Sequence, residues 1–169
     1  ISAERASSDR ERDLAVAMAR EALTRLANSE ASFAQEGNET PVAVTQIASE
    51  LRRSLSELGA DAMVEERGSH TVVPERVARA MVLAARQAIG NAFSHAAAKG
   101  LHVVVDASPA TPVRVIVQDS GPGFDLDAIG EDRLGIRASI IARMAAVAGT
   151  ASIRSDAGGT VVELTWRQG

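Results

Sequence analysis

The sequence of 169 residues contains no cysteine, no tyrosine and a single lysine, Lys99. Without cysteine, neither a disulfide framework nor a thiolate metal site can form, and a reducing compartment fits this composition. Because nearly all of the positive charge is carried by arginine, a clamp for phosphate groups must use arginine, histidine or backbone N–H groups.

Two further absences limit the surroundings of the chain. No apolar run approaches the roughly 18–20 residues that span a bilayer, and the polar start at residues 1–12 is not a signal peptide. A formal net charge of -4 offers no general attraction for nucleic acid or an anionic membrane. We therefore expect a cytoplasmic region. Because the chain begins with Ile1 rather than methionine, we also expect a further segment before it, such as a sensor or membrane anchor.

The first third of the chain predicts two amphipathic helices. Apolar residues recur at helical spacing from Asp9 to about Gln35 and again from Pro41 to Leu58, with Thr40 as the N-cap of the second helix. Residues 1–59 therefore predict an antiparallel helical hairpin for dimerisation, whose apolar stripes a second copy would cover in a four-helix bundle. The alternative is that both helices pack on their own domain.

The remainder, residues 60–169, predicts one α+β domain. Periodicity indicates helices at 74–98 and 137–148 and strands at 62–66, 101–107, 113–118, 150–155 and 160–166. No βαβ repeat is evident, so we expect a mixed sheet covered on one face by helices.

Polar residues on the central helix are the first candidate site. Gln87, Asn91 and His95 are spaced four apart, which aligns them along one helix face. The positions opposite are apolar and rich in alanine. A solvated helix face explains this stripe as well as a binding site does.

Three glycine-containing segments are the other candidates. Asp119-Ser120-Gly121-Pro122-Gly123-Phe124 follows a strand, where a carboxylate is able to accept a hydrogen bond from an exocyclic amine. Leu134-Gly135-Ile136 precedes the helix expected from Arg137, whose first N–H groups suit a phosphate. Gly158-Gly159-Thr160 opens the last strand. Each segment taken alone is typical of a simple turn.

The four motifs together, in this order, resemble the Bergerat ATPase of the GHKL superfamily over about Val73 to Trp166. The short segment between Gly123 and Gly135 and the preceding helical pair look like the nitrate-sensor and DesK-like class of sensor histidine kinases. The resemblance implies a Bergerat two-layer sandwich that binds ATP and Mg²⁺ in a two-component system. It also implies a response regulator as partner.

The same resemblance assigns roles to individual residues. It implies that Asn91 ligates Mg²⁺, which prefers oxygen ligands, and that Asp119 binds the adenine amine. The other implied ATP-binding residues are His95, Gly121, Gly123, Gly135, Arg137, Gly159 and Thr160. Phosphoryl transfer needs charge neutralisation, so Arg133 or Arg137 is a candidate to face the terminal phosphates.

The ATP-binding motifs also depart from the family pattern. The family's general-base glutamate is replaced by Gln87, and an amide cannot accept a proton at neutral pH. Ser94 stands where a lysine or arginine is common, and Arg133 stands where the family has glycine. Fewer phosphate contacts are therefore expected.

The phosphoacceptor motif departs further. Arg12-Asp13 occupies the place of the family's His-Asp pair, and none of the three histidines lies in residues 1–59. His70 and His102 lack metal-ligand partners at useful spacing. Three readings stay open: a histidine kinase whose acceptor lies upstream, a degenerate kinase that binds nucleotide or a partner without autophosphorylation, and an anti-sigma-factor-like serine kinase.

Overall fold

The computed structural model describes residues 39–68, 71–124 and 131–169. The helix predicted at residues 9–35, and with it Arg12, lies outside these residues. Within the described ranges no helix is both long enough and apolar enough to cross a bilayer.

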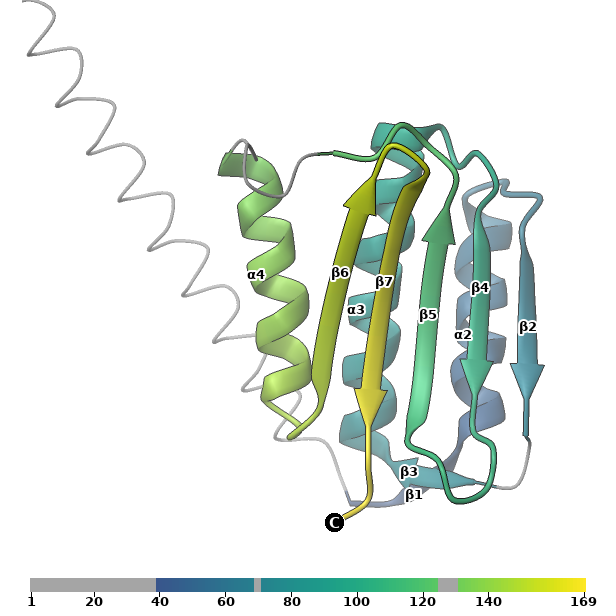
Figure 1. The fold of residues 1–169 in the computed structure, drawn as a ribbon. Helices are drawn as coiled ribbons and strands as arrows, with labels where there is room; N and C mark the ends of the chain where they lie inside the picture. The colour runs from purple at the N-terminus through teal and green to yellow at the C-terminus, as the bar shows by residue number, and fades with distance from the viewer. Residues whose placement is uncertain (1–38, 69–70, 125–130) are drawn as a thin grey trace, which may run out of the picture.

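A five-stranded mixed sheet forms one layer of the fold (Figure 1). Its order is β2-β4-β5-β7-β6, in which β2 pairs with β4 in parallel and all other neighbours are antiparallel. The strands are β2 (Met63–Arg67), β4 (His102–Asp106), β5 (Val113–Asp119), β6 (Thr150–Asp156) and β7 (Gly159–Trp166). Alternating burial along β5 turns Val113, Val115 and Val117 toward the core, as the period of a half-buried strand requires.

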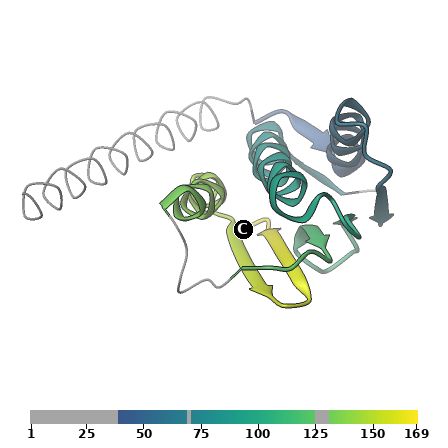
Figure 2. The same cartoon turned by 90° about the horizontal axis from the view of Figure 1, so that it is seen from above.

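Three helices form the second layer, and Figure 2 shows them together on one side of the sheet. They are α2 (Val44–Glu57), α3 (Glu75–Ala96) and α4 (Glu131–Ala145). The central helix, α3, contacts both flanking helices and also β5 and β7. The predicted α+β two-layer sandwich with a mixed sheet is thereby confirmed.

Small side chains allow α3 to lie close to the sheet. Its inward face is built largely of alanine, which favours the helix and adds little width. The buried alanines are Ala78, Ala80, Ala84, Ala85, Ala88 and Ala92. The helix follows Pro74 and ends at Ala97, which adopts the left-handed conformation with φ 48°.

A small second sheet corrects the predicted start of the second helix. Pro41–Ala43 forms β1, which pairs antiparallel with β3 (Val72–Pro74), so the helix begins at Val44 rather than Pro41. The Glu75 N–H also donates to the Thr40 carbonyl at 2.9 Å. A Thr-Pro pair suits a helix start, but proline is equally tolerated at the first residue of an edge strand. The pairing of β1 with β3 therefore makes residues 41–43 a strand instead of the first turn of the helix.

The apolar stripe of α2 is buried within its own chain. Val44, Ile47, Leu51 and Leu55 are at most 1% exposed, and α2 contacts α3 and β2. This helix therefore belongs to the same core as the sheet, and the α/β unit begins near Pro41 rather than at residue 60. The apolar spacing in the sequence indicated that one face of this helix is buried. It did not indicate whether that face packs on its own domain or on a second copy of the chain.

We predict that Leu51→Ala lowers the free energy of unfolding by about 2–5 kcal/mol, because its side chain is fully buried between α2 and the rest of the core. The exposed Glu57→Ala on the same helix should stay within about 0.5 kcal/mol. Denaturant unfolding at two protein concentrations measures both. A cost for Leu51→Ala that depended on concentration would place the stripe in a contact between chains instead.

Candidate functional site

A small hollow lies where β5 ends and β7 begins. Its volume is about 20 Å³, far below the roughly 300–1,000 Å³ typical of ligand pockets. It is lined by Asn91, His95, Ala96, Asp119, Gly123, Phe124 and Thr160. The lining ends at Phe124, directly before residues 125–130, which the structure does not describe.

Asp119 provides the carboxylate of this hollow. It is the last residue of β5, and its register partner on β7 is Thr160. The residue is 8% exposed, and its Oδ1 accepts a hydrogen bond from the Gly121 N–H at 2.9 Å. Oδ2 has no hydrogen-bond partner among the described residues. One oxygen therefore fixes the local turn, and the other is available as an acceptor.

Asp106 at the opposite end of the sheet gives a contrast. Its Oδ1 accepts hydrogen bonds from the N–H and the hydroxyl of Ser108, and its Oδ2 accepts one from Arg114 at 3.0 Å. The Ser108 hydroxyl, together with the Ser108 N–H and the Arg114 guanidinium, lowers the pKa of Asp106, against the opposing effect of burial. Both oxygens of Asp106 serve the fold, whereas only one oxygen of Asp119 does.

The β6–β7 hairpin holds the loop after Asp119. The Phe124 N–H donates to Ser155 Oγ at 2.9 Å, and that oxygen lies 2.8 Å from Thr160 Oγ1. Gly123 has φ +64°, and a Cβ at this position would lie 1.7 Å from the Asp156 carbonyl oxygen. Only glycine fits this close approach, so the loop and the hairpin are locked together.

The end of α3 closes the other side of the hollow. Asn91 is half-buried and His95 is exposed, and both line the hollow from successive turns. The Ser120 N–H donates to the Lys99 carbonyl at 2.8 Å, which fastens the loop after β5 to the segment that follows α3. The structure thus brings Asn91, His95, Asp119, Gly123 and Thr160 together, although they lie up to 69 positions apart in the sequence.

Two predicted pocket glycines lie beside the hollow without lining it. Gly121 packs against Ala96 of α3, and Gly159 packs on the backbone of Asp119. Both allow close packing around the carboxylate. Two lining residues, Ala96 and Phe124, were not among the predicted site residues, although Ala96 directly follows His95 and Phe124 ends the predicted segment that begins at Asp119.

The structure corrects the prediction made for the glycine segment at residues 134–136, which lies inside α4. The helix was expected to begin at Arg137, but α4 begins at Glu131, so Gly135 and Arg137 lie inside it and do not line the hollow. Their N–H groups fall beyond the first turn, where the helix itself uses them. Gly135 suggested a break, yet a helix tolerates an interior glycine at a cost of about 1 kcal/mol. The side chain of Arg133 lies outside the described residues.

Gln87 lies one turn before Asn91 on α3 and is held by the neighbouring helix. Its Oε1 accepts a hydrogen bond from Nη1 of Arg143 on α4, and Arg143 is buried. Arg143 was not predicted as a site residue. A signal was present, because this charged residue falls on the inward face of α4, three positions after the fully buried Ile140.

The described residues hold no group of three or more histidine, cysteine or acidic side chains able to bind a metal. Among the described residues, His102 contacts one acidic side chain, that of Glu65, at 3.3 Å on the surface. The Asn91 amide oxygen is a suitable but single ligand for Mg²⁺, which usually shares its shell with phosphate oxygens and water. The residues present fit a magnesium ion only when it arrives with a phosphate-bearing ligand.

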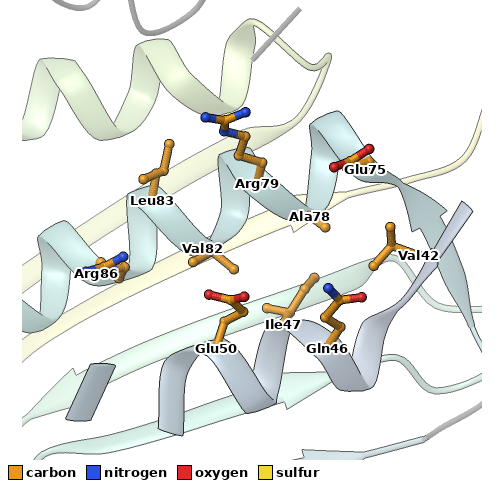
Figure 3. A pocket seen from close by; sticks show the side chains of 10 residues that line it. All are labelled: Val42, Gln46, Ile47, Glu50, Glu75, Ala78, Arg79, Val82, Leu83 and Arg86. Atoms are coloured by element: carbon orange, nitrogen blue, oxygen red, sulfur yellow. The ribbon is translucent and has the colours of Figure 1, made fainter. Parts of the chain in front are cut away.

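A wider groove lies elsewhere, between α2 and α3 (Figure 3). Apolar residues such as Ile47 and Val82 line it together with Glu50, Arg79 and Arg86. None of the predicted site residues lines this groove, so the hollow beside Asp119 remains the candidate site.

Comparison with known proteins finds relatives at the level of structure only. No family model and no curated protein matches this chain. Among solved structures, the ATP binding domain of PrrB from Mycobacterium tuberculosis superposes with a TM-score of 0.59 at 21% identity, covering 78% of this chain and 98% of that one.

Two longer histidine kinases are similar to the same degree. The histidine kinase domain of the blue-light activated kinase from Erythrobacter litoralis matches with a TM-score of 0.55 at 20% identity over 73% of this chain and 62% of that one. Full-length ShkA, in a complex with AMPPNP, matches with a TM-score of 0.55 at 21% identity over 79% of this chain and 33% of that one. The chain thus spans under two thirds of these two kinases, and it has the α+β fold of sensor histidine kinase ATP-binding domains.

Proposed function

We propose that this chain is the ATP-binding part of a cytoplasmic two-component sensor histidine kinase and that it binds Mg-ATP in the hollow beside Asp119. The observation that carries the proposal is the Asp119 carboxylate, one oxygen of which receives no hydrogen bond from the described residues, in a hollow shared with Asn91. A carboxylate oxygen that receives no hydrogen bond from the described residues is available to accept one from a ligand.

The residues of the hollow divide between the two ends of such a ligand. Asp119 accepts a hydrogen bond from the exocyclic amine of adenine, and the Phe124 side chain offers apolar surface to the ring. Asn91 presents an amide oxygen to a magnesium ion that arrives with the phosphates. When bound, Mg-ATP supplies the transferable phosphoryl group, and the protein supplies positioning and charge neutralisation.

The structural neighbours support the proposal. The PrrB fragment is described as an ATP binding domain, and ShkA was solved in a complex with AMPPNP. Those properties belong to the neighbours. They make adenine nucleotides the first ligands to test on this chain.

We predict that Asp119→Asn weakens the binding of ADP by roughly ten- to hundred-fold. The substitution keeps an oxygen for the Gly121 N–H and replaces the acceptor at Oδ2 with an amide donor, and a hydrogen bond to a charged group contributes about 1.5–3 kcal/mol. Calorimetric titration with ADP and with a non-hydrolysable ATP analogue, with and without Mg²⁺, measures the change.

The matched control for this titration is Asp61→Asn, which makes the same chemical change at an exposed residue before β2. It should bind nucleotide as the wild type does. The proposal is wrong if the folded wild type binds neither nucleotide, or if Asp119→Asn binds both as tightly as the control.

A second candidate function is nucleotide binding without autophosphorylation. It is favoured by Gln87, whose amide is held by Arg143 where a general base is expected, and by Arg12 at the expected phosphoacceptor position. A response regulator remains the partner expected for the kinase reading.

We predict that the 169-residue chain incorporates no acid-labile phosphate when incubated with Mg-ATP labelled at the γ-phosphate. The reason is that arginine cannot take the role of the phosphoacceptor histidine, and no histidine lies in residues 1–59. Gel autoradiography after alkaline and acid treatment measures the label. Alkali-stable, acid-labile label on His70, His95 or His102 would contradict this prediction.

We also predict that the chain is a homodimer through residues 9–35, whose apolar stripe needs a covering surface. Because α2 is already buried on its own domain, this prediction now depends on the first helix alone. Light scattering of the whole chain and of a chain that begins at Asn38 should give a dimer and a monomer. A monomeric whole chain would favour the anti-sigma-factor-like alternative.

A further inference from the structure

The groove between α2 and α3 is large enough to hold a ligand or a segment of chain. Its volume is about 320 Å³, within the roughly 300–1,000 Å³ typical of ligand pockets. Figure 3 shows Val82 of α3 and Ile47 of α2 pointing toward one another across it, and both side chains are buried. On α3 the lining extends from Glu75 to Arg86, a rise of roughly 16 Å. The groove therefore matches the length of about three helical turns.

Two exposed arginines stand beside this apolar floor. Arg79 and Arg86 line the groove from α3, and neither makes a hydrogen bond or an ion pair with any of the described residues. Arg76 on the same helix, in contrast, pairs with Glu39 at 2.6 Å. Glu75 also lines the groove, but it lies in the first turn of α3, where the helix N-terminus stabilises a negative charge. The groove thus suits an apolar segment that carries a carboxylate.

One segment of this chain has that pattern. The apolar stripe of the helix predicted at residues 9–35 includes Leu26 and Phe33. Glu30 falls on the same face, four positions after Leu26 and three before Phe33. A carboxylate within an apolar stripe is costly in a bundle made of such stripes alone, but it is stabilised where the covering surface carries a cation.

The segment also joins the described chain at one end of the groove. The Glu75 N–H donates to the Thr40 carbonyl at 2.9 Å, and Val42 lines the groove itself. Residues 35–38, Gln-Glu-Gly-Asn, contain turn-forming residues, and antiparallel helices are commonly joined by about 2–5 residues. So short a connection gives residues 22–34 a higher local concentration at this groove than a separate chain has.

We propose that residues 22–34 of this chain dock along the groove between α2 and α3, antiparallel to α3, and that Glu30 faces the two groove arginines. The apolar side chains on either side of Glu30 pack on the floor of the groove. The contact does not depend on nucleotide binding, because no residue of the groove lines the hollow. Residues 9–21 keep their own apolar positions for the second copy in the dimer predicted above.

Cross-linking of the whole chain with a carbodiimide tests this contact. The reagent joins a carboxylate directly to an amine, and Lys99 is the only lysine in the sequence. Arg79→Lys and Arg86→Lys, made separately, each place one further amine in the groove, and the matched control is Arg154→Lys at an exposed position of β6. We expect at least one groove variant to form a cross-link to Glu30, identified by mass spectrometry. Adding Glu30→Gln should abolish it, and the control should form none to Glu30.

Hydrogen exchange of the backbone N–H groups in residues 22–34 gives an independent readout. Changing both Arg79 and Arg86 to glutamate should speed this exchange by about two- to five-fold, as expected for the loss of a partly exposed ion pair. Adding Glu30→Arg to that variant should restore part of the protection. Thermal unfolding verifies that each variant is folded.

The outcomes separate the possible occupants of the groove. When chains of natural and heavy nitrogen are mixed before cross-linking, a link to Glu30 within one isotopic species supports the proposal. A link that joins a light chain to a heavy chain would place a second copy in the groove and overturn it. The proposal is also wrong if the groove variants link only to acidic residues of α2 and α3 and the charge reversals leave the exchange of residues 22–34 unchanged. No nucleotide is present in these experiments, so their failure leaves the proposed function standing.

Discussion

The close packing of α3 on the sheet is the constraint on which the rest of the structure depends. This helix contacts α2, α4, β5 and β7, and its alanine-rich face allows the approach. Because the side chains that face the sheet are small, α3 lies close to it. The polar residues Asn91 and His95 on its last turns therefore lie beside the ends of β5 and β7. Any larger residue at Ala88 or Ala92 would push the helix, and Asn91 with it, away from Asp119.

The hollow beside Asp119 is built mostly by backbone hydrogen bonds and glycine contacts. The loop after β5 is tied to the β6–β7 hairpin through Ser155, and to the end of α3 through the Lys99 carbonyl. The glycines that resemble a nucleotide motif serve packing first, since Gly121, Gly123 and Gly159 each touch a neighbouring atom too closely for a side chain. These glycines therefore allow the loop to pack closely on α3 and on the β6–β7 hairpin.

The helical layer contains exposed ion pairs and one buried guanidinium group. Surface pairs such as Arg53 with Glu50 are exposed and contribute little. Arg143 is buried between α3 and α4, where the neutral amide of Gln87 accepts its hydrogen bond. An amide at position 87 supplies the acceptor for Arg143 without adding a negative charge of its own.

The sequence by itself determined the α+β class and seven of the larger elements to within a few residues, because periodicity is a local signal. It grouped Asn91, Asp119 and Thr160 only through the resemblance to a known ATPase family, and the structure brings these three residues to one hollow. Only the tertiary structure decided that Pro41–Ala43 is a strand, that the stripe of α2 faces its own core, and that α4 begins before Gly135. Each of these depends on which surface a segment meets. The contact between Gln87 and Arg143 joins residues 56 positions apart, and no spacing rule within one helix predicts it.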